Sequence, residues 1–529
     1  MCKKITMEKK ISWNLAGLVF LFGAIFAGYF VYSNLNKGLI FNDEAYYLLH
    51  FRDFQKVITV DASNFFRIFQ PFYTDNIFHF RVITYLLLNS TTFLLFFLAA
   101  KYFVLKIHPI LIGSLGILFN FISWGATNIV LHQYIGNKVL TNLSLCFLLL
   151  YLLNRKSFLL IFSGFFLGIL MFDGIPHVTI FLPVGLFLLL NFWKIERKNI
   201  LYFGIGVLIA VLVYFTFIQK FSDFVSQLEY LKIYQQFHTK QHPKSFFFYW
   251  FAKVLGLIFF PGILAIFLIH RFARNRIKSI NNLIWIVAFI TILSLFFYPF
   301  VYLNYLLLLL LLYRYWLSEN SFAYKTFLTL LFLTQFCLAF GSGAYFEGRS
   351  GQYFIYFILT IVVILSSLYD FRYFLAFVIY CVFQVALLPD FVHTKGWKDF
   401  VFTEQTEPVK INGHDLLLDK KRKNDIEDLR PFLQNQPKVI YSNNHLVGYL
   451  YILDAYPPIP YYFTLKKYVK FILDKKGDQP DDYIYLESND YPFSPKEIIP
   501  LQFVNHPENF RVVKSGRFTL YLPKNFQEK

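Results

Sequence analysis

The stretch that decides the fold class reads VITYLLLNSTTFLLFFLAAKYFVL, residues 82–105. A helix needs about 20 mostly apolar residues to cross the hydrocarbon core of a bilayer, and this stretch provides them. Similar runs recur on both sides of it. Candidate spans lie near residues 12–33, 82–105, 109–124, 139–153, 157–172, 176–193, 199–218, 246–269, 281–299, 302–317, 325–342, 352–369 and 372–389. The sequence therefore predicts a polytopic α-helical membrane protein with about 13 transmembrane helices.

Composition divides the chain into two parts. Of its 529 residues, 57% are hydrophobic and only 16% are charged, whereas soluble domains carry roughly 25% charged residues. Residues 1–389 hold 30 basic and 13 acidic residues, and residues 390–529 hold 20 basic and 19 acidic ones. We therefore predict a transmembrane domain over 1–389 and a soluble domain over 390–529.

The second part has the pattern of an α/β domain. Short apolar runs at Lys438–Ser442 and Asp482–Leu486 predict strands, and Asn444–Ile452 predicts a helix after the first of them. The segment Phe510–Leu522 predicts a terminal hairpin with Gly516 in its turn. The four cysteines are far apart in the sequence and form no CxxC pair, so no disulfide framework or zinc site is indicated.

Loop charges predict the orientation. The basic residues of 1–389 form short clusters between apolar runs, which is typical of cytoplasmic loops and not of a nucleic-acid-binding stripe. The N-terminus is therefore expected in the cytoplasm of a cell (inner or plasma) membrane, and an odd number of spans places 390–529 outside. Two long outer loops, about 34–81 and 219–245, suit amphipathic helices lying on membrane lipids. The spans around 139–172 are short, which leaves a re-entrant pair there as an alternative.

The first outer loop carries the strongest local signal, Phe41-Asn-Asp-Glu-Ala-Tyr-Tyr47. Asp43 and Glu44 are adjacent carboxylates a few residues beyond the first span. One interpretation is a helix N-terminus, where Asn42 or Asp43 caps and Glu44 meets the positive end of the helix dipole. The other is a general base at the lipid–water boundary, which takes the proton of an acceptor hydroxyl. The two interpretations are compatible.

An outer Asp-Glu pair directly after the first span, followed by an aromatic residue, resembles the type C glycosyltransferases. Within that superfamily the chain looks most like the protein O-mannosyltransferases and the bacterial aminoarabinose (lipid A) transferase. The resemblance implies a polyprenyl-phosphate-linked sugar donor and a catalytic acid in the first outer loop, which would be Asp43 with Glu44 beside it. It extends to the architecture of spans, first loop and outer domain, and to Val439-Ile-Tyr-Ser-Asn-Asn444 in the tail.

The chain departs from this family at two places. Many bacterial members carry a His/Lys-Pro-Pro stretch before the second span, where this chain reads Phe69-Gln-Pro-Phe-Tyr73. Many also carry an Asp at the outer start of the fourth span, where this chain reads Tyr134-Ile-Gly-Asn-Lys138. Asn137 takes the place of that acid, and a neutral amide removes a second acidic group or metal ligand there.

Basic residues near the outer ends of spans are candidates for binding the donor phosphate. They are Arg81, Lys138 and Arg349. An arginine fork can donate two hydrogen bonds to one phosphate, although the same residues at helix ends commonly extend toward lipid headgroups. His132, Asn137 and His177 are candidates for the sugar pocket, against the alternative of interface histidines with ordinary hydrogen bonds. No paired histidine spacing predicts a metal site, and a divalent metal held by Asp43 remains an alternative.

The leading hypothesis is a glycosyltransferase that moves a sugar from a polyprenyl-phosphate donor to a hydroxyl of a lipid, protein or glycan acceptor, with inversion. A transporter or flippase of lipid-linked sugars is a second hypothesis, although the acids lie in outer loops and no repeat is evident. A polysaccharide polymerase or ligase is a third hypothesis, and a non-catalytic scaffold is a fourth.

The orientation gives a first prediction. A cysteine introduced beyond Asp390, as at Ser488, should react with a membrane-impermeant thiol reagent in intact cells, because the alternation of loop charges places this domain outside. Protection of such a site until the membrane is permeabilised would reverse the topology.

Overall fold

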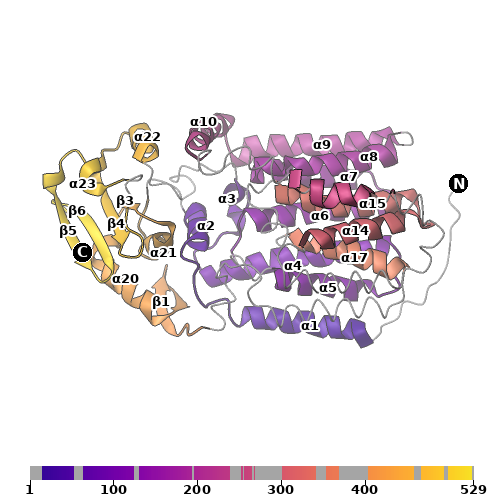
Figure 1. Ribbon diagram of the computed structural model, residues 1–529, viewed down its shortest axis with the longest axis horizontal. Helices are drawn as coiled ribbons and strands as arrows, with labels where there is room; N and C mark the ends of the chain where they lie inside the picture. The colour runs from indigo at the N-terminus through magenta and orange to yellow at the C-terminus, as the bar shows by residue number, and fades with distance from the viewer. Residues whose placement is uncertain are drawn as a thin grey trace.

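The computed structural model describes residues 15–52, 64–123, 130–193, 196–238, 252–253, 255–264, 267, 301–340, 353–368, 403–457, 466–493 and 498–526. Long helices run side by side as a bundle, and the C-terminal α/β domain sits at one end of it (Figure 1). Helices α2 (Asp43–Arg52) and α3 (Phe65–Ile68) of the loop 34–81 lie between the bundle and this domain (Figure 1). We call this loop and this domain outer after the orientation that the loop charges predict.

The helices of the bundle coincide with predicted spans. They are α1 (Leu15–Tyr32), α4 (Ile77–Tyr102), α5 (Pro109–Ser123), α6 (Gln133–Asn154), α7 (Phe158–Asp173), α8 (Phe181–Phe192), α9 (Arg197–Val213), α14 (Val301–Trp316), α15 (Phe322–Phe340) and α17 (Phe354–Leu368). In the described residues, 4 helices are long and apolar enough to cross a membrane, namely Ile77–Tyr102, Gln133–Asn154, Arg197–Ile218 and Phe322–Ala339. The predicted spans 281–299 and 372–389 lie outside the described residues, and 246–269 is described in part.

Helix α6 is longer than the sequence predicted. The His132 side chain caps its start, because Nδ1 accepts a hydrogen bond from the Tyr134 backbone N–H at 3.3 Å. The helix ends at Arg155, whose φ of 59° is left-handed and stops further helical bonding. With 22 residues α6 is long enough to cross a bilayer. The alternative of a re-entrant element is therefore wrong for α6.

Small residues let α6, α7 and α9 pack closely. The Ser144 hydroxyl of α6 donates to the Ser163 carbonyl of α7 at 2.9 Å, and the Ser163 hydroxyl donates back to the Ser144 carbonyl at 2.9 Å. A Cβ atom on Gly164 would collide with the Phe203 carbonyl of α9, and one on Gly206 would collide with the Ile161 carbonyl of α7. Backbones this close gain dispersion contacts that lipid cannot match, which is how small residues stabilise helix pairs in membranes.

A second polar cluster joins four helices inside the bundle. The Asn142 amide of α6 donates to the Thr92 hydroxyl of α4 at 3.0 Å, and Asn120 of α5 donates to the same hydroxyl at 2.7 Å. The Tyr356 hydroxyl of α17 donates to the Asn142 side-chain oxygen at 2.9 Å. Because buried amides are costly without partners, this cluster fixes the relative positions of the four helices.

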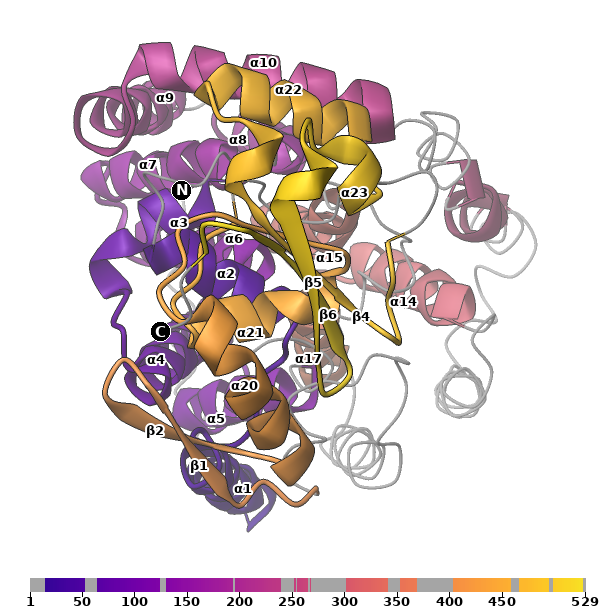
Figure 2. The ribbon, with the colours of Figure 1, turned by 90° about the vertical axis from the view of Figure 1, so that its left-hand side faces the viewer.

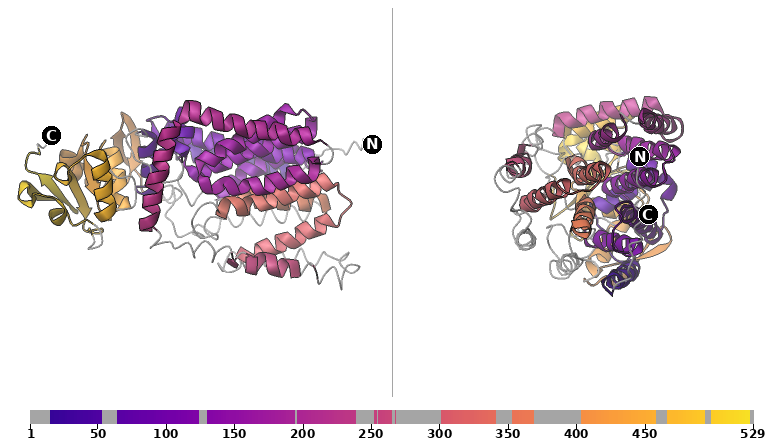
Figure 3. Two further views of the ribbon diagram at one scale, coloured as in Figure 1. Left: turned by 90° about the horizontal axis from the view of Figure 1, so that it is seen from above. Right: turned by 90° about the vertical axis from the view of Figure 1, so that its right-hand side faces the viewer.

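Helix α2 of the first outer loop is buried within the protein. The sequence had predicted an amphipathic helix lying on the membrane surface. Every residue of α2 from Glu44 to Phe51 is buried, because the outer domain covers one side of the helix and the bundle covers the other (Figure 2). The second loop forms α10 (Phe221–His238), which lies across the end of the bundle, crosswise to its long helices (Figure 3). Short helical turns at Gln70–Phe72 and Ile175–Ile180 complete the outer end.

The outer domain is α/β, and the predicted strands are present. A sheet of order β3-β4-β6-β5 contains β3 (Val439–Tyr441), β4 (Ile484–Ser488), β6 (Phe518–Pro523) and β5 (Phe510–Ser515). Strands β3 and β4 are parallel, and β5 and β6 form the predicted hairpin with Gly516 at a φ of +54°. Beside the sheet lie a second hairpin and the domain's helices: β1 (Glu407–Ile411), β2 (His414–Leu418), α20 (Lys420–Leu433), α21 (Val447–Ile452), α22 (Lys466–Lys476) and α23 (Pro500–Phe503).

The outer domain is attached to the first loop through backbone hydrogen bonds. The Gly38 N–H donates to the Leu417 carbonyl at 2.8 Å, and the Leu417 N–H donates to the Asn36 carbonyl at 2.9 Å. One turn of α21 contributes a third bond, from the Gly448 N–H to the Phe41 carbonyl at 2.8 Å. Backbone bonds of this kind do not depend on side-chain rotamers, so the domain has one defined position over α2.

An ion pair secures the far end of α2. The Arg52 guanidinium lies 3.0 Å from the Asp454 carboxylate and donates to the Tyr451 carbonyl at 3.1 Å.

The structure also refines the labelling site for the topology test. Ser488 is only 1% exposed, whereas the Glu508 side chain is 67% exposed, so Glu508→Cys is the better position for an impermeant reagent.

The tight contact at Gly448 gives a second prediction. A Cβ atom there would collide with the Phe41 ring, so Gly448→Ala should displace the outer domain from α2. The expected result is faster proteolysis between the two domains. Gly204→Ala in α9 is the control, because nothing lies within 4 Å of its added methyl group. Equal protease resistance of the two variants would show that the Gly448 contact does not hold the domain in place.

Candidate active site

The predicted acids open helix α2 and lie in different environments. Asp43 is half-buried, and Glu44 is completely buried. Their side chains differ because successive residues of a helix point about 100° apart. The sequence treated Asp43 and Glu44 as one pair at the loop surface, and the structure separates them.

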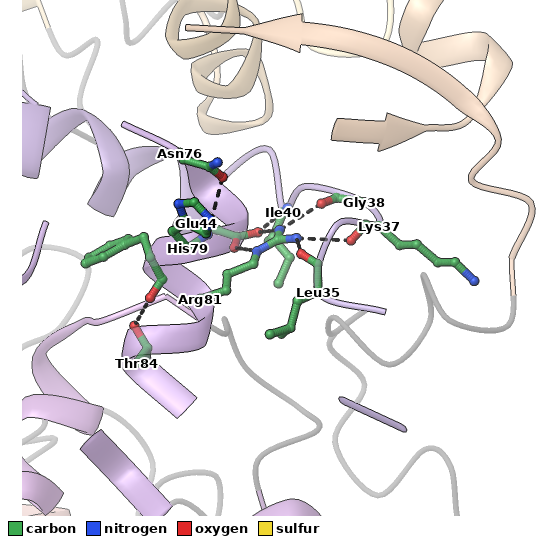
Figure 4. A network of polar contacts seen from close by, with 10 residues as sticks. Leu35, Lys37, Gly38, Ile40, Glu44, Asn76, His79, Arg81 and Thr84 are labelled. Carbon is green, nitrogen blue, oxygen red and sulfur yellow. Dashed lines mark hydrogen bonds and ion pairs between the residues drawn. The ribbon is translucent and has the colours of Figure 1, made fainter. Parts of the chain in front are cut away.

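Glu44 forms a buried ion pair with Arg81 of α4 (Figure 4). The Arg81 Nε donates to Glu44 Oε1 at 2.8 Å, and Nη2 donates to Oε2 at 2.9 Å. The Ile40 backbone N–H also donates to Glu44 Oε2, at 3.0 Å. Both side chains are 0% exposed. This two-point geometry is the strongest that a guanidinium and a carboxylate can form.

The remaining Arg81 donors are bound to the end of the first span. Nη1 donates to the carbonyls of Leu35 at 2.6 Å and Lys37 at 3.2 Å. Nη2 donates to the Gly38 carbonyl at 2.7 Å (Figure 4). All N–H groups of the guanidinium therefore have protein acceptors. Binding a donor phosphate would require breaking these bonds, so this geometry does not favour the phosphate role predicted for Arg81.

Glu44 is occupied in the same way. Its two oxygens accept bonds from Arg81 and Ile40 inside the protein, so it is shielded from substrate. Its evident role is to hold the start of α2 against the turn that follows α1. Asp43 is thereby fixed at the outer edge of the bundle, where it stays partly open to solvent.

His132 lies directly inward of the same helix face. Its ring stacks on Tyr47 with centroids 5.1 Å apart and an interplanar angle of 16°. Tyr47 follows Asp43 by four residues, so the two share one side of α2. The predicted residue His132 therefore contacts Tyr47, which lies one helical turn along α2 from Asp43. The His132 ring is buried and caps α6.

Two other predicted residues meet inside the bundle. The Asn137 amide donates to His177 Nε2 at 2.5 Å and to the Tyr353 hydroxyl at 3.5 Å. Asn137 Oδ1 is buried and has no hydrogen-bond partner among the described residues. Asn137 follows His132 by five residues, which places it roughly 8 Å further along α6. The amide oxygen is thus available to a bound hydroxyl group.

Lys138 is buried at the same level of α6, with 3% of its surface exposed. No carboxylate pairs with it among the residues that the structure describes. An ammonium group inside a membrane bundle is costly and is usually matched by a partner or a ligand. Within the described ranges, Arg81 is paired with Glu44 and Lys138 has no carboxylate partner. Arg349 lies outside those ranges.

The structure adds residues that the sequence did not assign to the site. Tyr353 approaches Asn137 from α17. Asp173 ends α7 with its carboxylate against Gly136, where a Cβ atom would lie 3.1 Å from Oδ1. His445 of the outer domain lies close enough to Asp43 for that carboxylate to act on its pKa. These residues are far apart in the sequence, so only the fold brings them together.

A metal-binding group is not assembled in the described part of the chain. No cluster of three or more His, Cys, Asp or Glu side chains occurs in those residues. Arg81 and the Ile40 N–H bind both oxygens of Glu44.

The ion pair gives a third prediction. Glu44→Gln should strongly destabilise the protein, because it leaves the Arg81 charge buried without a counterion, a change that typically costs about 3–5 kcal/mol. The measurement is the temperature at which the detergent-solubilised protein aggregates. Asp43→Asn is the control and should shift that temperature little, since Asp43 is half-buried, is not part of the Glu44–Arg81 ion pair, and is replaced by a side chain of the same shape. A Glu44→Gln protein as stable as Asp43→Asn would contradict this role of the pair.

Comparison with known proteins gives one structural likeness. No family model matches the chain, and no curated protein matches its sequence. The chain is similar to the Archaeoglobus fulgidus oligosaccharyltransferase, whose crystal structure is of a complex with Zn and sulfate. The TM-score is 0.43 and the sequence identity 13%, over 89% of this chain and 68% of that chain. A likeness at this level assigns neither an activity nor a role to any residue.

Proposed function

We propose that this protein is a membrane glycosyltransferase that moves a sugar from a polyprenyl-phosphate donor to an acceptor hydroxyl on the outer side of the membrane. The observation that carries the proposal is the division of labour in the Asp43–Glu44 motif. Glu44 is buried and fully bonded, and Asp43 beside it is held partly open at the boundary between bundle and outer domain.

Asp43 acts as the general base. Its carboxylate takes the proton of the acceptor hydroxyl while the hydroxyl oxygen attacks the anomeric carbon of the sugar. The bond from that carbon to the phosphate oxygen breaks, and the carrier phosphate leaves with the electron pair. Attack from the face opposite the leaving group inverts the anomeric centre. No nucleotide cofactor enters this reaction.

Lys138 supplies positive charge for the leaving phosphate. Its ammonium group is buried and has no acidic partner in the described part of the chain, so an anionic ligand would satisfy it. A fixed charge of this kind stabilises the negative charge that develops on the leaving oxygen. Arg349 stays a prediction for the same role.

The sugar fits the polar group between α6, the helical turn Ile175–Ile180 and α17. Asn137 and His177 are already in contact, and the Tyr353 hydroxyl lies 3.5 Å from the same amide. Their hydrogen-bonding atoms suit sugar hydroxyls. The stacking of His132 of the α6 cap on Tyr47 of α2 connects the start of α6 to the first loop. The acceptor would approach from the outer domain, where Asp43 is open.

A transporter of lipid-linked sugars is the second candidate. The buried Lys138, Asn137 and His177 favour it, because transporters place polar groups within their helices. Transport does not need a base in an outer loop, whereas transfer needs the Asp43 carboxylate. The effect of replacing Asp43 therefore distinguishes the two functions.

The proposal predicts that Asp43→Asn abolishes transfer. The amide keeps the shape of the side chain but cannot accept the acceptor's proton, and loss of a general base typically lowers the rate by a factor of about a hundred to ten thousand. The measurement is sugar transfer from a polyprenyl-phosphate donor by protein purified into lipid nanodiscs.

Asp75→Asn is the matched control, because Asp75 is an exposed acid of the same loop. It should transfer sugar at the normal rate. Near-normal transfer by Asp43→Asn would remove the catalytic assignment. Lipid-linked sugar crossing a vesicle bilayer at an undiminished rate with Asp43→Asn would favour the transporter.

A further inference from the structure

The outer domain presents two polar side chains to the Asp43 loop. Arg422 comes from the first turn of α20, and His445 comes from the segment between β3 and α21. The backbone fixes their distance from the motif, because the Gly448 N–H binds the Phe41 carbonyl at 2.8 Å. Gly448 follows His445 by three residues, and Phe41 precedes Asp43 by two.

The Arg422 guanidinium is fixed by its neighbours but forms no ion pair among the described residues. Its guanidinium carbon lies 4.3 Å from the centre of the Phe41 ring, and Nη1 donates to the Tyr449 hydroxyl at 2.8 Å. No other side-chain hydrogen bond and no ion pair binds this guanidinium among the described residues. A stacked guanidinium keeps the N–H groups at its edge open to a ligand, and Arg422 is only half-buried.

A second arginine at the same tyrosine shows what a purely structural role looks like. Arg517 also donates to the Tyr449 hydroxyl, at 2.8 Å. Two carboxylates neutralise it, Asp425 at 2.8 Å and Asp490 at 2.5 Å. Arg422 has the same neighbour and no carboxylate, so its charge is left for something outside the described residues.

His445 borders the same space. Its ring stacks on Tyr491 with centroids 4.9 Å apart, and it is half-buried. Burial and the Arg422 charge lower the pKa of His445, and the Asp43 carboxylate opposes them. The ring is therefore neutral near pH 7 and offers one donor and one acceptor nitrogen. The His445 ring therefore lies near both the negative charge of Asp43 and the positive charge of Arg422.

We propose that Arg422 and His445 form an anion-binding site in the outer domain, next to Asp43, which takes a phosphoryl group of a substrate. The chemistry follows from the fork of Arg422, which matches two oxygens of a phosphate. The substrate's identity rests on the proposed function, since the phosphoryl group would be that of the carrier lipid or of a soluble phosphate compound. The outer domain then contributes two binding residues to the site, in addition to burying α2.

Binding of two probes to the full-length protein in nanodiscs tests this site. The probes are undecaprenyl phosphate and inorganic phosphate. Arg422→Gln should weaken binding of a phosphate probe about ten- to a hundredfold, as expected for hydrogen bonds to a charged group. Arg422→Lys should recover only part of the affinity, because an ammonium lacks the fork. His445→Gln should weaken binding a few-fold.

Arg430→Gln on the same helix is the control, because that arginine is exposed and bonds only Gln434 in the described residues. Loss of lipid binding alone assigns the site to the carrier, and loss of binding to both probes assigns it to any phosphate. Unchanged affinity for both probes in a protease-resistant Arg422→Gln protein overturns the site. This outcome is separate from catalysis, since active Asp43→Asn would refute the base and leave the anion site standing.

Discussion

The buried bond between Glu44 and Arg81 is the constraint on which the rest of this structure depends. It joins the start of α2 to the start of α4, and through three carbonyl oxygens it holds the turn that follows α1. The same turn binds the outer domain through the Gly38 N–H. An arginine buried in a membrane protein must have all its donors satisfied. That requirement fixes the turn, and the turn fixes both the loop and the domain above it.

In the proposed reaction, this constraint would hold the Asp43 base in place. Adjacent acids in a loop would ordinarily share solvent and repel each other. Here Glu44 is taken out of solvent by a matched cation and a backbone N–H, so the loop cannot shift without exposing or stranding a charge. Because Asp43 directly precedes Glu44, the ion pair also fixes the backbone at Asp43, which is not itself part of the pair. A base that is already fixed loses less conformational freedom when the transition state forms, which lowers the entropic part of the barrier.

Sequence alone predicted the elements that local composition decides. The spans over α1, α4 and α5 follow from continuous apolar runs, and β3, β4 and the β5–β6 hairpin follow from short apolar runs bounded by turn residues. Loop 219–245 contains the helix that its apolar spacing predicted.

What sequence could not predict were contacts between distant segments. Arg81 had the signature of a phosphate ligand because nothing in its neighbourhood shows that Glu44, 37 residues earlier, would bind it. Helix α2 was expected on lipid because its cover, α21, lies some four hundred residues further along the chain. Arg422 and His445 carried no motif at all. Their significance arises only when the outer domain is docked on Phe41.

The most direct measurement is the position of the donor in an experimental structure of the protein with a polyprenyl-phosphate sugar bound. The account predicts that the sugar lies between Asp43 and the Asn137–His177 pair, with its anomeric carbon facing the Asp43 side. It predicts that the leaving phosphate lies within reach of Lys138, on the side of the sugar away from Asp43. A donor bound far from Asp43, or a sugar whose anomeric carbon faces away from that carboxylate, would contradict the proposed reaction.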